Sequence, residues 1–208
     1  LGAIQIGLQV LRSLGVELPE QPTPEDIGQA YGLSRSLWQD KSPLELLDLP
    51  EMADPNRLAA MQILSWLVPC AYIGNPALML IVIFKQVELS ILYGNSPISI
   101  YGYGDYALVL CGVMNDIPSG FVVGQLALGL LEKLQANSFK SRLQYIFYYF
   151  TQHWKTPLRS ALPELQKGYK IGLEIGELDL GCLNAAGYCV YSYPAGQELT
   201  DLMGEIEV

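Results

Sequence analysis

The spacing of four prolines restricts the fold of this chain more than any other feature of the sequence. They follow one another at intervals of 21 residues, at Pro55, Pro76, Pro97 and Pro118. Three of them directly follow a residue that often caps helices, namely Asp54, Asn75 and Ser96. Proline after an N-cap is typical of a first helical turn, because the missing N–H would have no partner there. Each interval therefore predicts one helix and one turn.

The interval also predicts how the helices are grouped. Twenty-one residues less a turn leave about 17 helical residues, so two helices make a unit of about 42 residues, a period typical of helical solenoids. Gly74 and Gly94 stand just upstream of the turns, as helix C-caps often do. The sequence predicts helices at about 2–14, 24–41, 55–73, 76–93, 97–114, 118–135, 139–155, 157–175 and 178–193, with a short one near residue 196. Thr23 is the expected N-cap of the second helix. No segment has the pattern of a strand.

These elements predict an all-α protein built from stacked antiparallel helical hairpins. We expect a right-handed solenoid of about nine or ten helices that resembles tetratricopeptide repeats. Residues 1–208 are interpreted as a single helical-repeat domain cut from a larger protein, because the chain opens on Leu1 rather than Met. Within it, residues 1–22 are expected to be the last helix of a preceding unit plus a linker. Residues 23–53 would be an N-terminal helix and a connecting segment, in which Leu44–Leu49 lays a hydrophobic turn across the stack, and residues 54–208 the hairpin stack.

Charge and cysteine usage exclude several kinds of partner. The net charge is −9 and the 12 basic residues are scattered, whereas nucleic acids and anionic lipid surfaces require clustered Lys and Arg. The cysteines are Cys70, Cys111, Cys182 and Cys189, without CxxC spacing, and one histidine cannot complete an ordinary zinc site with them. We expect buried free thiols, a cytoplasmic location, no metal and no cofactor.

Membrane insertion is not expected. The long uncharged run from Leu58 to Phe84 is interrupted by Pro69, Asn75 and Pro76. A membrane span needs about 20 mainly apolar residues and avoids such breaks in the hydrocarbon region. Lys85 and Glu88 follow on the next predicted helix, whose other residues suit burial between neighbouring helices. Small residues in several predicted helices, such as Gly168, Gly172 and Gly187, would let helices approach closely.

Three patterns suggest chemistry, and each has a simpler structural explanation. Gly102–Ala107 matches a dinucleotide-binding fingerprint, but no buried strand precedes it. Glu174, Glu177 and Asp179 could bind a hard cation, although acids at a helix start favour the helix dipole without any metal. His153 has no evident nucleophile or acid partner in the sequence, and a histidine near a helix end commonly faces the helix dipole.

No phosphate-binding loop with its lysine, no GxSxG elbow and no kinase Asp-Phe-Gly motif occurs in the chain. We therefore expect no enzymatic activity from this segment. An enzyme built around His153 is a third possibility, after the two non-catalytic functions described below.

Tyrosines supply the candidate interaction site. Tyr103 and Tyr106 share one predicted helix, Tyr145 and Tyr149 share another, and residues 103 and 145 are one period of 42 residues apart. Alternate helices of a solenoid line the same concave surface. These four tyrosines are therefore predicted to line a groove that binds a neighbouring domain or peptide, with core packing as the alternative.

Several short motifs resemble the helical region of bacterial, mainly cyanobacterial, multi-sensor signal transduction multi-kinases. The motifs are Leu46–Met52 with Asp54-Pro55, Ala71–Ile73 before Asn75-Pro76, Tyr106–Leu108 with Gly112 and Asp116, and His153–Lys155. In proteins of this type a Ser/Thr kinase domain and an AAA/STAND-type ATPase precede the helical region, and GAF and histidine-kinase modules follow it. The resemblance runs through nearly all 208 residues, and the Leu-Asp-Leu-Pro-Glu-Met run is its most specific part. It implies a regulatory region without an active site of its own.

The predicted function is a non-catalytic protein-interaction and signal-relay module of a large signalling kinase. Its partners would be neighbouring domains of the same chain or other proteins, and an oligomer is possible. The alternative is a ligand-sensing helical domain that binds a small apolar molecule among Tyr and Met side chains. A melting shift with a metabolite library would favour the second function.

Overall fold

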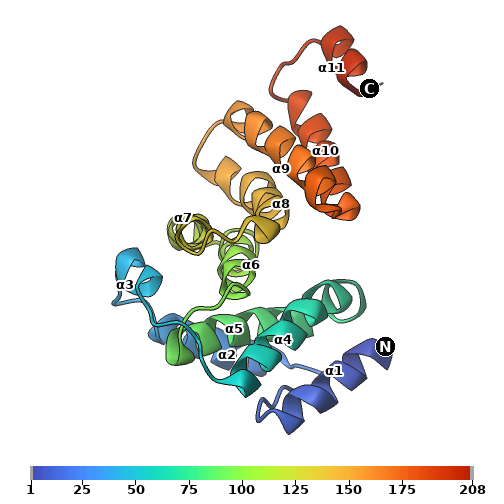
Figure 1. Ribbon diagram of the computed structural model, residues 1–208. Helices are drawn as coiled ribbons and strands as arrows, with labels where there is room; N and C mark the ends of the chain where they lie inside the picture. The colour runs from blue at the N-terminus through green and yellow to red at the C-terminus, as the bar shows by residue number, and fades with distance from the viewer. Residues whose placement is uncertain (1, 207–208) are drawn as a thin grey trace. The chain divides into compact units, whose positions relative to one another are not determined.

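The computed structural model describes residues 2–206, and its regular elements in this range are helical (Figure 1). The α-helices are α1 (Gly2–Ser13), α2 (Pro24–Ser36), α3 (Pro43–Leu47), α4 (Pro55–Gly74), α5 (Pro76–Tyr93), α6 (Ser99–Gly112), α7 (Ile117–Lys133), α8 (Lys140–Gln144), α9 (Leu162–Ile175), α10 (Leu178–Ser192) and α11 (Leu199–Ile206). Over the same residues the chain forms no β-strand, only an isolated bridge between Glu51 and Asn95. The prediction of an all-α protein is confirmed.

The first two of the prolines spaced 21 residues apart each begin a helix, because a capping residue precedes them. A side-chain oxygen of Asp54 accepts from the N–H of Asn56 at 2.8 Å, and α4 then begins at Pro55. Asn75 caps α5 in the same way, accepting from Leu78 at 3.2 Å. Thr23 and Asp26 form a complete capping box at the start of α2.

At the third proline the predicted start is wrong by two residues. Ser96 and Pro97 form a turn in which the N–H of Ser96 donates to Oγ of Ser99 at 3.0 Å, and α6 begins only at Ser99. The helix starts late because the Ser99 side chain accepts from the backbone N–H of Ser96. Ser96 and Pro97 therefore stay in a turn, instead of forming the N-cap and the first residue of the helix.

The predicted continuous helix over residues 139–155 is also wrong. The chain forms a 3₁₀ turn η1 (Asn137–Phe139), α8, a π-helical segment η2 (Tyr145–Tyr149) and another 3₁₀ turn η3 (Gln152–Trp154). The π-helical segment coincides with the aromatic run that starts at Tyr145. Residues four apart share one face of a helix, so the rings of Tyr145 and Tyr149 can stack in this segment. A further 3₁₀ turn, η4 (Leu158–Ser160), precedes α9.

The chain divides into two compact units, Leu1–Tyr106 and Ala107–Val208, with the boundary inside α6. In the first unit α4 runs beside α5, α1 packs on α4, and α2 packs on α5 (Figure 1). Gly7 of α1 lies directly against Leu67 of α4. Leu8 and Leu11 of α1 are buried, and the interpretation of residues 1–22 as the last helix of a preceding unit plus a linker stays a prediction.

A strap of residues 46–52 crosses the turn between α5 and α6 in the first unit. The side-chain amide of Asn95 donates to the carbonyl of Leu46 at 2.7 Å, and backbone bonds join Asn95 to Pro50 and Met52, each at 2.8 Å. At the two ends of the strap the side chains of Leu46 and Met52 are buried, whereas Leu44, just before it, is exposed. Of the leucines expected to form a hydrophobic turn, Leu46 is buried, and a turn laid across a helical stack stays a prediction.

In the second unit, glycines set the distance between α8, α9 and α10. Gly172 of α9 faces Gly181 of α10, and Gly168 faces the side chain of Asn184 so closely that neither site has room for a Cβ. The Asn184 amide donates to the carbonyl of Ser141 on α8 at 3.0 Å, and the Ser141 hydroxyl donates to the carbonyl of Gly168 at 2.9 Å. The predicted role of these glycines in close helix contacts is confirmed.

Among the described residues, one helix is long and apolar enough to cross a membrane by length and composition, namely α5. Half of it is buried inside the protein, where it packs on α2 and α4. On its half-buried side Lys85 and Glu88 form an ion pair at 2.6 Å. Core helices of globular proteins pass the same length and composition test, so the absence of membrane insertion stays a prediction.

The expectation that all four cysteines are buried is wrong. All four are free thiols, but Cys70 and Cys182 are exposed and Cys189 is half-buried. Cys111 is buried, and burial raises the pKa of its thiol to about 11. The two exposed cysteines lie in α4 and α10, on faces that also expose large apolar side chains, such as Ile73 and Leu183. Because these exposed faces are as apolar as the core faces, the sequence pattern does not distinguish the two.

Candidate interaction site

Two of the four predicted site tyrosines are core residues of the first unit. Tyr103 and Tyr106 are almost fully enclosed, and burial raises the pKa of both phenols. The hydroxyl of Tyr103 donates to Oδ1 of Asn95 at 3.0 Å. That of Tyr106 lies 3.2 Å from the hydroxyl of Ser34 and accepts from the indole N–H of Trp38 at 3.4 Å. With rings buried and hydroxyls satisfied, neither residue offers a partner an accessible surface.

The other two tyrosines are half-buried and lie together in the second unit. The rings of Tyr145 and Tyr149 are stacked, with centroids 5.2 Å apart and an angle of 11° between their planes. Tyr191 of α10 continues the stack, its centroid 4.8 Å from that of Tyr149. Gly187 makes this possible, because a Cβ there would lie 3.0 Å from the Tyr149 ring. We call Tyr145, Tyr149 and Tyr191 the tyrosine stack.

Hydrogen bonds fix one end of the tyrosine stack. The phenol of Tyr191 donates to the carbonyl of Tyr149, which lies near the end of the helical run and so lacks a full set of helical partners. The phenol oxygen also lies 3.0 Å from Nδ1 of His153, and the Tyr149 carbonyl is a hydrogen-bond partner of His153 as well. Burial raises the pKa of Tyr191 to about 12, so the phenol keeps its proton. The Tyr191 phenol oxygen and the Tyr149 carbonyl oxygen can both accept a hydrogen bond, so they match a neutral His153 with its proton on Nδ1.

Sequence reasoning missed Tyr191 and the partner of His153. The signal that could have found Tyr191 was present, because residues 149 and 191 are 42 apart, the same period that linked Tyr103 to Tyr145. The period was applied to the wrong pair. His153 and Tyr191 are 38 residues apart and meet only because α10 packs on η2.

We expect acid to destabilise the protein through His153. Burial lowers the pKa of this imidazole below its ordinary value of 6.5, so the unfolded chain takes up the proton more readily than the folded one. The stabilising contribution is complete above that value and is lost as the pH falls through the lower folded pKa. Urea unfolding between about pH 7.5 and about pH 5.5 should show this loss. His153→Gln should flatten the curve, and an unchanged slope in that variant would contradict the assignment.

The structure also places the glycine and acidic patterns of the sequence. Residues 102–107 lie inside α6, so their backbone amides are not arranged as a loop that cradles phosphate. Burial and the neighbouring Asp179 raise the pKa of Glu177, opposed by Arg142. In the part of the chain that the structure describes, no group of three or more His, Cys, Asp or Glu side chains could hold a metal ion.

No protein-family model, no curated protein and no solved structure matches this chain. The resemblance to multi-sensor kinases therefore stays a prediction that rests on the short motifs quoted above. The tyrosine stack is the candidate site on its own geometry, because its three rings are stacked on one another within one compact unit and are only half-buried.

Proposed function

We propose that the chain is a non-catalytic protein-interaction and signal-relay module of a large signalling kinase, linking an ATPase and kinase part to sensor domains. The observation that carries this proposal is the tyrosine stack, held in place by Gly187 and by the bond from Tyr191 to the Tyr149 carbonyl. Tyrosine edges supply both apolar contact and hydrogen bonds, and they lose little conformational entropy on binding when their rings are already packed.

We also propose that the helices are stacked as hairpins in a tetratricopeptide-like solenoid. Support comes from contacts at the predicted period: Asn184 bonds to Ser141, 43 residues away, and Tyr191 bonds to Tyr149, 42 residues away. These contacts join alternate helices, as expected where the first helices of successive hairpins lie side by side. The sequential pairs α4 with α5 and α9 with α10 supply the hairpins themselves.

A cytoplasmic location belongs to the same proposal. It is supported by the four free thiols, two of them exposed, which a reducing compartment preserves. A signalling kinase with ATPase and sensor modules would keep this region in that compartment.

The first test is to determine the gene sequence on both sides of the segment that encodes this chain. The proposal expects ATPase and kinase sequences on one side and GAF or histidine-kinase sequences on the other. Flanking sequences of an unrelated metabolic enzyme would overturn it. A melting shift with an apolar metabolite, absent in a Tyr149→Ser variant, would favour the ligand-sensing alternative instead.

The second test measures binding to the flanking domains by titration calorimetry. Replacing Tyr145 and Tyr149 together with serine should weaken association at least about tenfold, because truncating an aromatic hot-spot residue costs about 2 kcal/mol or more of binding free energy. Tyr72 of α4 is the matched control, since it is an exposed tyrosine outside the stack. Equal losses for Tyr72→Ser and the double variant, or unchanged affinity in both, would contradict a docking role for the stack.

A further inference from the structure

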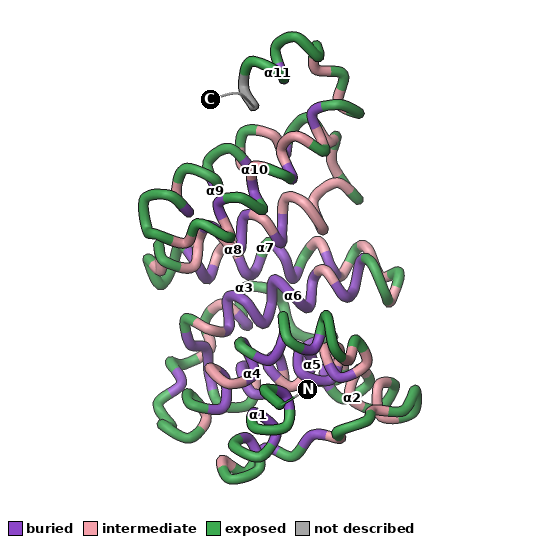
Figure 2. Tube along the Cα trace, turned by 90° about the vertical axis from the view of Figure 1, so that its right-hand side faces the viewer, coloured by how far each residue is buried: buried purple, intermediate pink, exposed green. Residues whose placement is uncertain are grey.

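Helix α10 has a face that the described residues of its unit leave exposed. Leu183 and Val190 of α10, with Tyr193 just after it, lie at helical spacing and are 42%, 55% and 70% exposed. Cys182 and Ala186 on the same face are exposed as well. Figure 2 shows α10 exposed or half-buried along most of its length. The buried face of α10, with Gly181, Asn184 and Gly187, carries the contacts to α8, α9 and η2.

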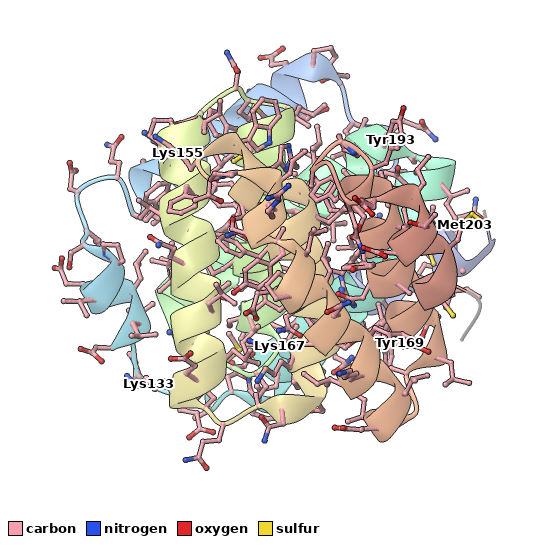
Figure 3. The ribbon with its side chains drawn as sticks, turned by 90° about the horizontal axis from the view of Figure 1, so that it is seen from above. Lys133, Lys155, Lys167, Tyr169, Tyr193 and Met203 are labelled. Carbon is pink, nitrogen blue, oxygen red and sulfur yellow. The ribbon has the colours of Figure 1, made fainter. Side chains whose placement is uncertain are left out.

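Helix α11 extends this apolar surface. It contacts α10, and its Leu199 and Met203 are mostly exposed while Leu202 is buried. Seen from above, the labelled side chains of Tyr193 and Met203 lie on the side of the unit formed by α10 and α11 (Figure 3). We define the C-terminal apolar face by its five large exposed side chains, which are Leu183, Val190, Tyr193, Leu199 and Met203.

The chain segment that forms this face carries acidic residues and no basic ones. From residue 171 to residue 208 the sequence contains no Lys, Arg or His. The same segment carries seven acids: Glu174, Glu177, Asp179, Glu198, Asp201, Glu205 and Glu207. Four of these, Glu174, Asp179, Glu198 and Asp201, are exposed. Arg159 reaches the loop after α10, where its guanidinium donates to the carbonyl of Ala195 at 2.7 Å.

We propose that the C-terminal apolar face binds a basic amphipathic helix of another protein segment. The apolar row from Leu183 to Tyr193 is about 15 Å long, which matches about three turns of a partner helix whose apolar residues recur at helical spacing. The acids at both ends of the row favour a partner with Lys or Arg beside its apolar stripe. Anionic lipid and nucleic acid are disfavoured by the same acids. The inference rests on the proposed function, for which it names one class of partner.

Fluorescence anisotropy of labelled 18-residue peptides tests the proposal with the full chain. A Leu/Lys peptide with one apolar face should bind saturably. A Leu/Glu peptide of the same pattern, and a scrambled Leu/Lys peptide without an apolar face, should each bind at least about tenfold more weakly. Equal binding of the scrambled peptide would overturn the proposal in favour of unspecific charge attraction.

Variants locate the binding surface. Leu183→Ser with Val190→Ser should weaken binding of the Leu/Lys peptide about tenfold, whereas Val113→Ser should leave it within about twofold. Val113 is a matched control because it belongs to the same unit and is 53% exposed. Similar losses in both variants would overturn the proposal.

Two other partners of the C-terminal apolar face, a second copy of the chain and a lipid surface, would give different experimental results. Light scattering that shows a dimer lost on Leu183→Ser with Val190→Ser would overturn the proposal in favour of a second copy of the chain. Binding to phosphatidylcholine vesicles that is lost in the same variant would overturn it in favour of a lipid surface. Because the peptides are synthetic, this experiment can fail while the tyrosine stack still binds the flanking domains, and the reverse also holds.

Discussion

Gly94→Ala should lower the free energy of unfolding of the first unit by about 3 kcal/mol. Gly94 ends α5 with a φ of +102° and a ψ of 168°, a conformation that residues with a Cβ rarely adopt. An added Cβ would also overlap the carbonyl oxygen of Pro50 and lie 3.1 Å from the nitrogen of Met52. Both atoms belong to the backbone of the strap, so the substitution requires either a strained residue or a displaced strap.

Gly15→Ala is the matched control for this prediction. Gly15 also has a positive φ, +75°, but no atom lies within 4 Å of the position of its Cβ. Gly15→Ala should lower the free energy of unfolding by only about 1 kcal/mol, because the left-handed backbone is the only unfavourable feature of alanine there. Urea unfolding followed by circular dichroism gives both values, and hydrogen exchange assigns the loss to the strap. Similar losses for the two variants would show that the strap does not constrain Gly94.

Gly172→Ala should destabilise the second unit by about 2 kcal/mol, although alanine is the better helix former. A Cβ at Gly172 would lie 2.7 Å from both the Cα and the N of Gly181. Backbone atoms cannot rotate away as a side chain can, so α9 and α10 would have to separate. That separation would also lengthen the bonds that join Ser141 to Gly168 and Asn184.

Gly28 serves as the control, because alanine at this position is expected to raise the free energy of unfolding instead of lowering it. Gly28 lies within α2 and has no atom within 4 Å of the position of its Cβ. Gly28→Ala should therefore stabilise the protein by up to about 1 kcal/mol, the helix propensity difference. Thermal and urea unfolding of the two variants decide the matter. A stabilising effect at Gly172 would mean that α9 and α10 are not held together by this contact.

Helix boundaries were predictable wherever a local cap determines them. Asp54 and Asn75 bond to amides two or three residues away, and such bonds depend only on the nearby sequence. The boundary at Ser99 and the broken helix after Lys140 were not predictable in this way. The first depends on a choice between two nearby serines, and the second on aromatic rings that stack after the helices have packed.

The candidate site was predicted only in part, because half-burial is not a property of a residue type. Tyr106 and Tyr149 are chemically identical, yet the first lies against Trp38 and Phe84 in a core while the second lies beside Tyr191 at the edge of a unit. Both positions suit an aromatic residue on a helix. Which one keeps an accessible edge depends on the helices that cover it.

The sequence by itself determined the helical class, most caps and the period of 42 residues that recurs between Tyr149 and Tyr191. These properties follow from backbone hydrogen bonding and side-chain chemistry within a few residues, and from a repeated chain length. Tertiary structure decided which tyrosines are buried, that His153 meets Tyr191, and that α10 keeps an apolar face open. Burial and long-range contacts depend on the packing of whole helices, to which residues far apart in the sequence contribute together.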